Sequence, residues 1–355
     1  MMAANAGTAV AAALTHLRRQ GYAPGTVQGS PIRMPVHAFI FPGQGSQAVG
    51  MGRDLAAAFP VAREVFQELD ETLRQNLSRL MFEGPAEELT LTENTQPALM
   101  AHSLAVLRVL EKEGGITLKQ KSAVVAGHSL GEYTALSAAG AFTLADAARL
   151  LKLRGQAMQK AVPAGEGAMA ALLGADLEQA RALCQAAAPV PDSVPPQTEV
   201  IQVANDNGAG QVVVSGHRGA VERAVEQASG VGIRRAMLLP VSAPFHCALM
   251  APAADAMAEA LEKTPPGMPA VPLIANVSAA KETDPARIRT LLVEQVTATV
   301  RWRECVQAMT ALGVDSFVEL GSGKVLSGLI RRIASDSVSI SAGTPAEVEA
   351  LLKAL

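Results

Sequence analysis

The stretch VVAGHSLGEYTALSAAG, residues 124–140, decides the fold class of this chain. Its β-branched residues lead into a Gly-x-Ser-x-Gly turn, and small residues in a helical pattern follow. A strand, this turn and a helix in succession form a nucleophile elbow, a sharp corner that lifts a serine hydroxyl clear of a sheet. We therefore expect Ser129 to be a nucleophile and the N–H of Leu130 to stabilise an oxyanion. The alternative is that Ser129 only caps the helix.

Strand-like and helix-like segments alternate on both sides of the elbow, from residue 36 onward. VHAFIFPG, KSAVVAG and DSFVELG are typical of buried strands, whereas VAREVFQELDETLR carries an apolar helical stripe. The last helix begins at TPAE, where Thr344 and Glu347 are spaced to form a capping box. This alternation predicts an α/β fold, in which helices cover both faces of a mostly parallel sheet.

The middle of the chain, residues 163–238, has a different order of elements. GAMAALLG, TEVIQVAN, QVVVSG and GIRRAMLLPV are typical of strands, and DLEQARALCQAAA and HRGAVERAVEQASG are typical of helices. The order is βαββαβ, the split βαβ arrangement of ferredoxin-like domains. The sequence thus predicts that residues 163–238 form a ferredoxin-like small domain. This domain is inserted into an α/β-hydrolase-like core with a parallel sheet, and the core is formed by residues 36–162 and 239–355.

The composition excludes several classes of function. Hydrophobic residues make up 49% and charged residues 18%, which is typical of a soluble protein with a sizeable core, and no apolar stretch is long enough to span a membrane. A formal charge of −3 with 3% aromatic residues gives no reason to expect nucleic acid as a partner. Three widely spaced cysteines favour a reducing compartment, and without a Cys/His cluster no metal is expected.

Residues 1–35 form an N-terminal extension with two interpretations. They contain no Asp or Glu, carry Arg18, Arg19 and Arg33, and include the alanine-rich AVAAALTHL. A transit peptide is one interpretation, and it predicts location in an organelle matrix. The other is an unprocessed extension on a cytoplasmic protein.

A serine nucleophile needs a general base, most often histidine. Among the six histidines, His246 lies in LPVSAPFHCALM, a loop where the chain re-enters the large domain, and such loops often supply site residues. His128 adjoins the serine but is expected to point to the opposite side of the turn. His16 lies in the N-terminal extension, and His37, His102 and His217 lie in or beside ordinary elements, which favours structural roles. We therefore expect His246 to be the base.

The helix predicted at TLADAARLLKLRGQAMQKAV carries an arginine on its apolar face. It opens with Thr143 and Asp146 at capping-box spacing. Arg154 lies in the middle of the apolar stripe, and a buried charge is costly unless it is paired. Either its guanidinium reaches the surface or a structural carboxylate, or it faces the active site and binds a carboxylate of the substrate. The stripe consists of Ala147, Leu150, Leu151, Met158 and Ala161.

A glycine-rich segment, FPGQGSQAVGMG, follows the first strand. Its glycines allow the backbone to approach a bound group closely, so the N–H of Gln44 is a candidate for the second oxyanion donor. As a phosphate-binding loop the segment is weak, because no GK[ST] follows it.

The full set of motifs resembles one family, the malonyl-CoA:acyl carrier protein transacylases of fatty acid synthesis. The resemblance covers about residues 36–333 and is far more specific than the serine motif alone. It implies that Ser129 is acylated, that His246 is its base and that Arg154 holds the malonyl carboxylate. The matching motifs, in chain order, are FPGQGSQ, TQPAL, GHSLGEY, RGQAMQ, ANDNGAGQVVVSG, PVSAPFHCALM, LVEQV and GSGKVLSGLI.

The resemblance assigns further positions around the serine. Gln44 and Leu130 match the backbone oxyanion donors, and Gln295 resembles the residue whose main-chain carbonyl orients the histidine. Asn205 and Asn207 match asparagines that line the cleft between the two domains. The family thus works with a Ser-His pair and no acidic third member.

The resemblance also implies substrates and partners. The substrates are malonyl-CoA, a coenzyme A thioester, and holo acyl carrier protein, an acidic and transient partner; no bound cofactor is implied, and a monomer is expected. Candidate residues for carrier docking are Arg234, Arg235, Arg331 and Arg332, with solvated surface charge as the alternative.

Two positions depart from the family pattern. Asp206 replaces an aromatic residue between the two asparagines, and Phe245 precedes the histidine where many bacterial members have serine. In related polyketide acyltransferases a phenylalanine there accompanies malonyl preference over methylmalonyl, so this departure favours malonyl. The rival interpretation is an α/β-hydrolase-type esterase or thioesterase, for which Asp206 would be the best acid. A third interpretation is an inert module that binds acyl carrier protein, and it requires that Ser129 and His246 lie too far apart to react.

Overall fold

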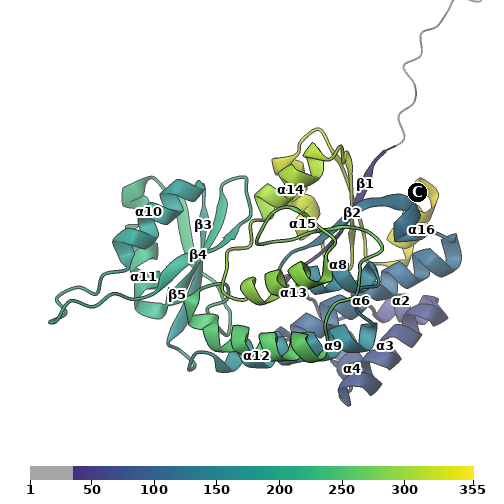
Figure 1. Cartoon of the computed structure of the whole chain (residues 1–355), viewed down its shortest axis with the longest axis horizontal. Helices are drawn as coiled ribbons and strands as arrows, with labels where there is room; N and C mark the ends of the chain where they lie inside the picture. The colour runs from purple at the N-terminus through teal and green to yellow at the C-terminus, as the bar shows by residue number, and fades with distance from the viewer. Residues whose placement is uncertain (1–34) are drawn as a thin grey trace, which may run out of the picture. The chain divides into compact units, whose positions relative to one another are not determined.

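The structure is a computed structural model that describes residues 35–355. The predicted N-terminal extension, residues 1–35, lies outside this range apart from its last residue. Two separate sheets organise the described chain, a six-stranded sheet and a four-stranded sheet (Figure 1).

The six-stranded sheet is parallel except at one edge. Its first five strands pair in parallel, and only β8 runs antiparallel to its neighbour β7. The predicted α/β class with a mostly parallel sheet is therefore confirmed. In sheet order the strands are β10 (Val338–Ala342), β9 (Ser316–Leu320), β1 (His37–Phe41), β2 (Ser122–Gly127), β7 (Leu273–Ile274) and β8 (Lys281–Glu282).

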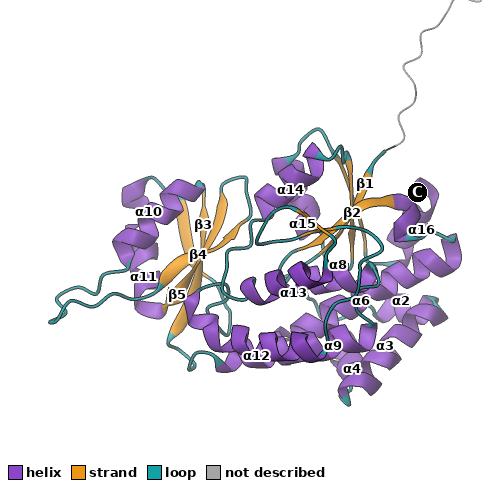
Figure 2. Cartoon of the chain, in the orientation of Figure 1, coloured by secondary structure: helices purple, strands orange, loops and turns teal. Residues whose placement is uncertain are grey.

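Helices pack on both faces of this sheet because its strands are apolar on both sides (Figure 2). Along β1, Phe39 and Phe41 belong to the large core cluster, whereas Ala38 and Ile40 belong to a second cluster with Trp302 on the opposite face. The helices are α2 (Arg53–Ala58), α3 (Pro60–Leu73), α4 (Leu77–Glu83), α5 (Ala86–Thr90), α6 (Thr92–Gly114), α7 (Leu118–Lys121), α8 (Leu130–Ala138), α9 (Leu144–Lys160), α12 (Ala251–Lys263), α13 (Pro285–Glu294), α14 (Trp302–Ala311), α15 (Val325–Ile333) and α16 (Pro345–Ala354), with the 3₁₀ turn η2 (Ala248–Met250).

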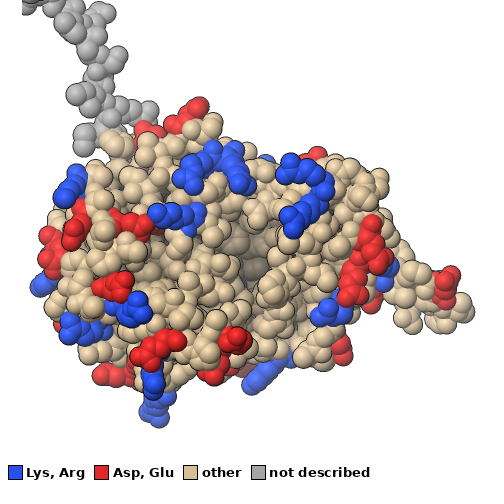
Figure 3. Space-filling view, turned by 180° about the vertical axis from the view of Figure 1, so that it is seen from behind, with Lys and Arg blue, Asp and Glu red and all other residues tan. Residues whose placement is uncertain are grey.

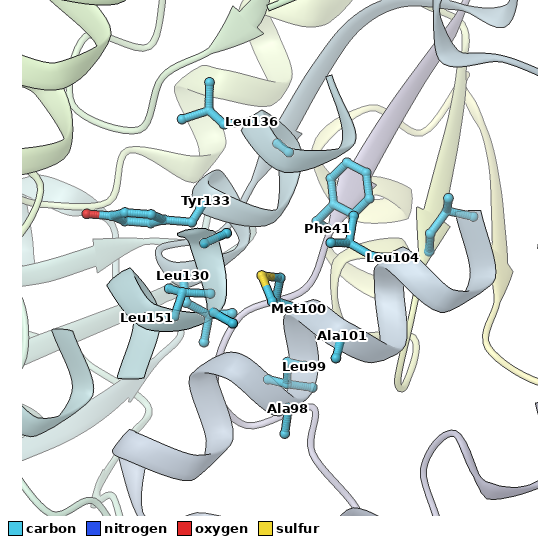
Figure 4. Packing of buried hydrophobic residues seen from close by; sticks show 14 of the residues in the cluster. Phe41, Ala98, Leu99, Met100, Ala101, Leu104, Leu130, Tyr133, Leu136 and Leu151 are labelled. Carbon is cyan, nitrogen blue, oxygen red and sulfur yellow. The ribbon is translucent and has the colours of Figure 1, made fainter. Parts of the chain in front are cut away.

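The large core cluster lies directly beneath the elbow. Figure 4 shows Leu130 and Tyr133 of α8 near Leu151 of α9 and Met100 of α6. All four side chains are buried. The helix that follows the serine is therefore anchored by apolar packing, which holds the elbow in place.

The predicted capping box is complete in α16, whereas α9 makes only one of its two hydrogen bonds. Thr344 and Glu347 form the complete capping box of α16. At α9 the Thr143 hydroxyl accepts the Asp146 N–H, but the Asp146 carboxylate accepts the Thr143 hydroxyl instead of its backbone N–H. Aspartate is one methylene shorter than the glutamate of a capping box, so the reciprocal bond is not made.

The four-stranded sheet contains the elements predicted for residues 163–238, in the predicted order. Its pairs are all antiparallel, and the strand order is β4-β5-β3-β6. Along β3, Ala168, Ala170 and Leu172 pack with the two helices, whereas Met169 belongs to the large core cluster. The elements are β3 (Gly167–Leu173), α10 (Leu177–Ala187), β4 (Ile201–Asp206), β5 (Gln211–His217), α11 (Arg218–Gln227), η1 (Ala228–Val231) and β6 (Arg235–Leu238).

Candidate active site

Ser129 lies at the corner between β2 and α8, where the sequence predicts the elbow. Its backbone has a φ of 53° and a ψ of −109°, a strained conformation for a residue with a side chain. Both glycines of the motif are needed, because a Cβ on Gly127 would lie 1.9 Å from the Gly131 carbonyl oxygen, and one on Gly131 would lie 2.3 Å from that of Phe41. The Ser129 N–H donates to Asn276 Oδ1 at 2.8 Å, which ties the corner to a distant loop.

The structure brings Ser129 and His246 into direct contact. Ser129 Oγ lies 2.8 Å from His246 Nε2, and His246 Nδ1 lies 2.8 Å from the main-chain oxygen of Gln295. A carbonyl oxygen only accepts, so Nδ1 carries the ring proton and Nε2 accepts the proton of the serine hydroxyl. Burial, assisted by the charge of Arg154, lowers the pKa of His246 to about 3, which keeps the ring neutral.

Two residues that line the cavity around the serine have backbone N–H groups without a protein partner among the described residues. Gln44 and Leu130 line the same cavity as Ser129, and within residues 35–355 neither N–H donates a hydrogen bond. The segment that carries Gln44 packs closely on the elbow, because a Cβ on Gly43 would lie 2.7 Å from the His128 carbonyl oxygen. Free N–H groups in this position are suited to an oxyanion.

Arg154 points inward from α9, and its side chain is only 1% exposed. Its Nη1 donates to Gln96 Oε1 at 2.7 Å, and its Nη2 donates to Ser129 Oγ at 3.1 Å and to Gln295 Oε1 at 3.0 Å. Its buried Nε has no partner, and no carboxylate of the described chain lies within salt-bridge distance. Of the predicted alternatives, the structure therefore excludes both the surface position and the structural carboxylate.

These groups line one cavity of about 570 Å³ between the two sheets. Asn205, Asn207 and Phe245 line it as well, as the resemblance implies for the asparagines. His128 lines this cavity too, and its Nε2 lies 2.9 Å from Asn207 Oδ1.

The sequence analysis missed three polar residues around the site. Gln96 on α6 accepts a hydrogen bond from Arg154, and Asn276 after β7 accepts one from the Ser129 N–H. Glu132 on α8 accepts a hydrogen bond from the side-chain amide of Gln295 at 2.9 Å. Burial raises the pKa of Glu132 to about 7. Gln96 and Glu132 lie within the motifs TQPAL and GHSLGEY, but no periodicity signals their roles.

The acid that a hydrolase would need is occupied elsewhere. Asp206 Oδ2 accepts from Arg303 Nε at 2.9 Å and lies 2.7 Å from its Nη2, while Oδ1 accepts the Gly208 N–H. His246 Nδ1 already contacts Gln295. The geometry thus provides a Ser-His pair without a carboxylate, which disfavours the esterase interpretation.

Other polar candidates have structural contacts. His37, His102 and His217 bond to Ser316 Oγ, the Gly343 oxygen and the Val200 N–H respectively. Within residues 35–355, no group of three or more His, Cys, Asp or Glu side chains is arranged to hold a metal ion, and no helix combines the length and apolarity needed to cross a membrane.

Comparisons with known proteins agree with this geometry. Residues 38–345 match the family model of the acyl transferase domain. A malonyl CoA-acyl carrier protein transacylase of Bacillus subtilis is 48% identical, over 90% of this chain and 96% of its own length. The solved acyl-carrier-protein-S-malonyltransferase of Bartonella henselae is 54% identical with a TM-score of 0.85, and covers 90% of this chain and 99% of its own.

A further solved structure contains a partner. It is a type II PKS acyl-carrier protein in complex with its malonyl-transacylase, which is 42% identical with a TM-score of 0.85 and covers 90% of this chain and 100% of its own. The family model and the high identity over nearly the whole described chain agree with the resemblance inferred from the motifs. This chain therefore belongs to the acyl transferase domain family and is an acyltransferase.

Proposed function

We propose that this chain moves malonyl groups from malonyl-CoA to the phosphopantetheine thiol of holo acyl carrier protein, and so supplies fatty acid biosynthesis. The single observation that carries the proposal is Arg154, a fully buried guanidinium 3.1 Å from Ser129 Oγ that has no carboxylate partner within residues 35–355. A site with such a group favours an acyl chain that brings its own carboxylate. The names of the relatives support malonyl as that acyl group and acyl carrier protein as the acceptor.

The first half-reaction acylates the serine. His246 Nε2 takes the hydroxyl proton as Ser129 Oγ attacks the thioester carbonyl of malonyl-CoA. The Gln295 carbonyl stabilises the imidazolium that forms, because Nδ1–H donates to it. The tetrahedral intermediate collapses, the C–S bond breaks, and coenzyme A leaves with the proton from His246.

The oxyanion of the intermediate is stabilised by the N–H groups of Gln44 and Leu130. Neither N–H group has an acceptor among the residues that the structure describes, which supports this role. The N–H of Leu130 also lies at the N-terminus of α8, where the helix dipole favours negative charge.

Arg154 binds the malonyl carboxylate through one edge of its guanidinium. The unpartnered Nε–H and an Nη2–H lie on the same edge, and Nη2 now donates to Ser129 Oγ. Once the Ser129 hydroxyl is acylated, Nη2 gives up its hydrogen bond to Oγ. The Nε–H and the Nη2–H can then both donate to the malonyl carboxylate. Phe245 lies beside the pocket for the acyl group and excludes an α-methyl group on the substrate. Asn205 and Asn207 line the cleft next to it.

The second half-reaction transfers the malonyl group. The phosphopantetheine thiol enters the vacated cleft, loses its proton to His246, and attacks the Ser129 ester. The C–O bond breaks, and the proton on His246 returns to Oγ. This ping-pong cycle needs no bound cofactor or metal.

The domain that contains the four-stranded sheet covers the cleft. Residues 163–238 form a ferredoxin-like domain inserted between the two parts of the α/β-hydrolase-like core, residues 36–162 and 239–355. The antiparallel strand order and the two helices on one face support this assignment. Met169 and Val213 line the cavity from this domain, and their apolar side chains disfavour water relative to the thiol.

The acceptor is an acidic, transiently bound carrier protein. Arg234, Arg235, Arg331 and Arg332 are exposed and make no salt bridge within the described residues, so they remain candidates for docking. Figure 3 shows Lys and Arg side chains gathered above a hollow on one face. We also propose a monomer in the cytoplasm, where the three buried cysteines, none of which forms a disulfide, stay reduced.

A trapping experiment tests the function. The protein is incubated with labelled malonyl-CoA, the acyl-enzyme is isolated, and holo acyl carrier protein or buffer alone is added. We expect a label on Ser129 that persists in buffer and passes to the carrier, and Ser129→Ala serves as the unlabelled control. Rapid release of malonate to water would identify a hydrolase instead, and no label on the native chain would identify an inert module.

A further inference from the structure

We infer that Glu132 is a positioning residue that sets the preference for carboxylate-bearing acyl groups, by fixing the side-chain amide of Gln295 against Arg154. The inference rests on the proposed function, because it concerns how the carboxylate-binding guanidinium is held. Glu132 makes no hydrogen bond to Ser129 Oγ or His246 in the described chain, so it has no direct part in acyl transfer.

The amide of Gln295 has only one orientation that satisfies its neighbours. Its Nε2 faces three oxygen atoms, Glu132 Oε2 at 2.9 Å, the Ser129 carbonyl at 3.2 Å and Asn276 Oδ1 at 3.3 Å. Its Oε1 faces the opposite way and accepts from Arg154 Nη2 at 3.0 Å. A flipped amide would set oxygen against three acceptors and its NH₂ group against the guanidinium N–H groups.

Glu132 dominates this orientation among the three acceptors. It makes the shortest of the three contacts to Nε2, at 2.9 Å. The same oxygen also accepts the Asn276 N–H at 2.9 Å, so the carboxylate fixes the loop that holds the Ser129 N–H.

The position of Glu132 is costly, which argues for a role in the site. The side chain is 1% exposed, and its second oxygen, Oε1, has no hydrogen-bond partner in the described chain. A carboxylate buried in this way is disfavoured unless its bonds repay desolvation. Its two hydrogen bonds from protein donors lead to Gln295 and Asn276, and both residues contact the reacting groups.

The chain of contacts predicts a selective defect. Without the Glu132 acceptor, the Gln295 amide loses the shortest of its three contacts, so the acceptor of Arg154 Nη2 is less firmly fixed. The guanidinium is then less well placed for a substrate carboxylate, whereas an acyl group without a carboxylate does not use this contact. Glu132→Ala should therefore lower kcat/KM for malonyl-CoA more than for acetyl-CoA, and reduce their ratio about tenfold, the loss of roughly one hydrogen bond.

The experiment compares kcat/KM for malonyl-CoA and acetyl-CoA in native protein, Glu132→Ala, Glu132→Gln, Gln295→Leu and the double variant Glu132→Ala/Gln295→Leu. The glutamine at 132 keeps an amide oxygen for both donors, so its ratio should stay near the native one. Gln295→Leu removes the side-chain amide but keeps the main-chain oxygen that contacts His246. If Glu132 acts through Gln295, the double variant has the same ratio as Gln295→Leu alone.

Three results would overturn the inference. An unchanged ratio in Glu132→Ala would mean a merely structural role, and a ratio in Glu132→Gln as low as in Glu132→Ala would mean that charge matters instead of amide orientation. Additive losses in the double variant would mean that Glu132 does not act through Gln295. If Glu132→Ala fails to fold, the ratios of Glu132→Gln and Gln295→Leu still decide, since the inference requires the first to be native-like and the second to be reduced.

Failure of this inference is distinguishable from failure of the proposed function. Arg154→Ala is measured beside the other variants. If it loses the malonyl preference while Glu132→Ala keeps it, only the role of Glu132 is refuted. If Arg154→Ala keeps the preference, the carboxylate-binding role of Arg154 itself is refuted.

Discussion

Replacing Arg154 by alanine should convert a malonyl-selective enzyme into one with little preference between malonyl-CoA and acetyl-CoA. A guanidinium has five N–H donors, and three hydrogen bonds to Gln96, Gln295 and Ser129 are made in the free enzyme. The Arg154 Nε–H has no partner among the described residues, and the contact of Nη2 with Ser129 Oγ is released on acylation. Two charge-assisted bonds to the carboxylate therefore depend on this residue.

The magnitude follows from these two bonds. A hydrogen bond to a charged group contributes about 1.5–3 kcal/mol, so two of them contribute about 3–6 kcal/mol. Each ~1.4 kcal/mol changes a rate ratio tenfold. The ratio of kcat/KM for malonyl-CoA over acetyl-CoA should therefore fall by roughly 10²–10⁴ in Arg154→Ala. Acetyl-CoA should react at least as well as in the native protein, because its methyl group no longer has to approach a buried charge.

The assay is single-turnover labelling of Ser129 with each thioester, with circular dichroism as a check on folding. Arg149→Ala is a matched control, because Arg149 lies on the same helix with its side chain 61% exposed. Arg154→Lys keeps the charge but not the two-point geometry, so its ratio should lie between those of the native protein and Arg154→Ala. An unchanged ratio in folded Arg154→Ala would refute the reasoning.

Four further outcomes are expected. Phe245→Ala should raise kcat/KM for methylmalonyl-CoA at least several-fold by opening the acyl pocket, and no gain in steady-state assays would contradict the steric role. The rate of Ser129 acylation should hold its plateau from pH 7 down to pH 5, because burial depresses the His246 pKa to about 3 and a depressed pKa leaves the base neutral at lower pH; an inflection near 6.5 in a pH-rate profile argues against this. Gly127→Ala should abolish soluble expression or lower the Tm steeply, since its Cβ would lie 1.9 Å from a backbone oxygen, and a native-like melting curve would be inconsistent with the elbow geometry. Asp206→Asn should keep a rate of acyl transfer within about tenfold of the native rate, because Asp206 pairs with Arg303 and not with His246. If carrier loading instead showed a loss of rate of more than about a thousandfold, Asp206 would be the acid of a hydrolase triad.

Local pattern was sufficient for the features that depend on neighbours in the chain. The elbow follows from a strand, two glycines and a helix, and the inward position of Arg154 follows from the 3.6-residue period of α9. The order of strands and helices in residues 163–238 was readable for the same reason.

Contacts between distant segments were beyond any local pattern. Asn276 holds the N–H of a serine 147 positions earlier, and Gln295 contacts His246 through its backbone and Arg154 through its side chain. Gln96 and Glu132 carry no periodic signal that separates them from ordinary polar residues of a helix.

By itself the sequence determined the α/β class, the corner that exposes Ser129, and the place of Arg154 on the apolar stripe of its helix, because each depends on residues within a few turns of one another. The resemblance of its motifs supported the choice of His246 as the base and added the carbonyl that orients it. Only the tertiary structure decided that Arg154 has no carboxylate partner in the described part of the chain and that Asp206 is held by Arg303. Whether a buried charge is already neutralised depends on which distant side chains the packing brings within a few ångströms, and that information exists only in three dimensions.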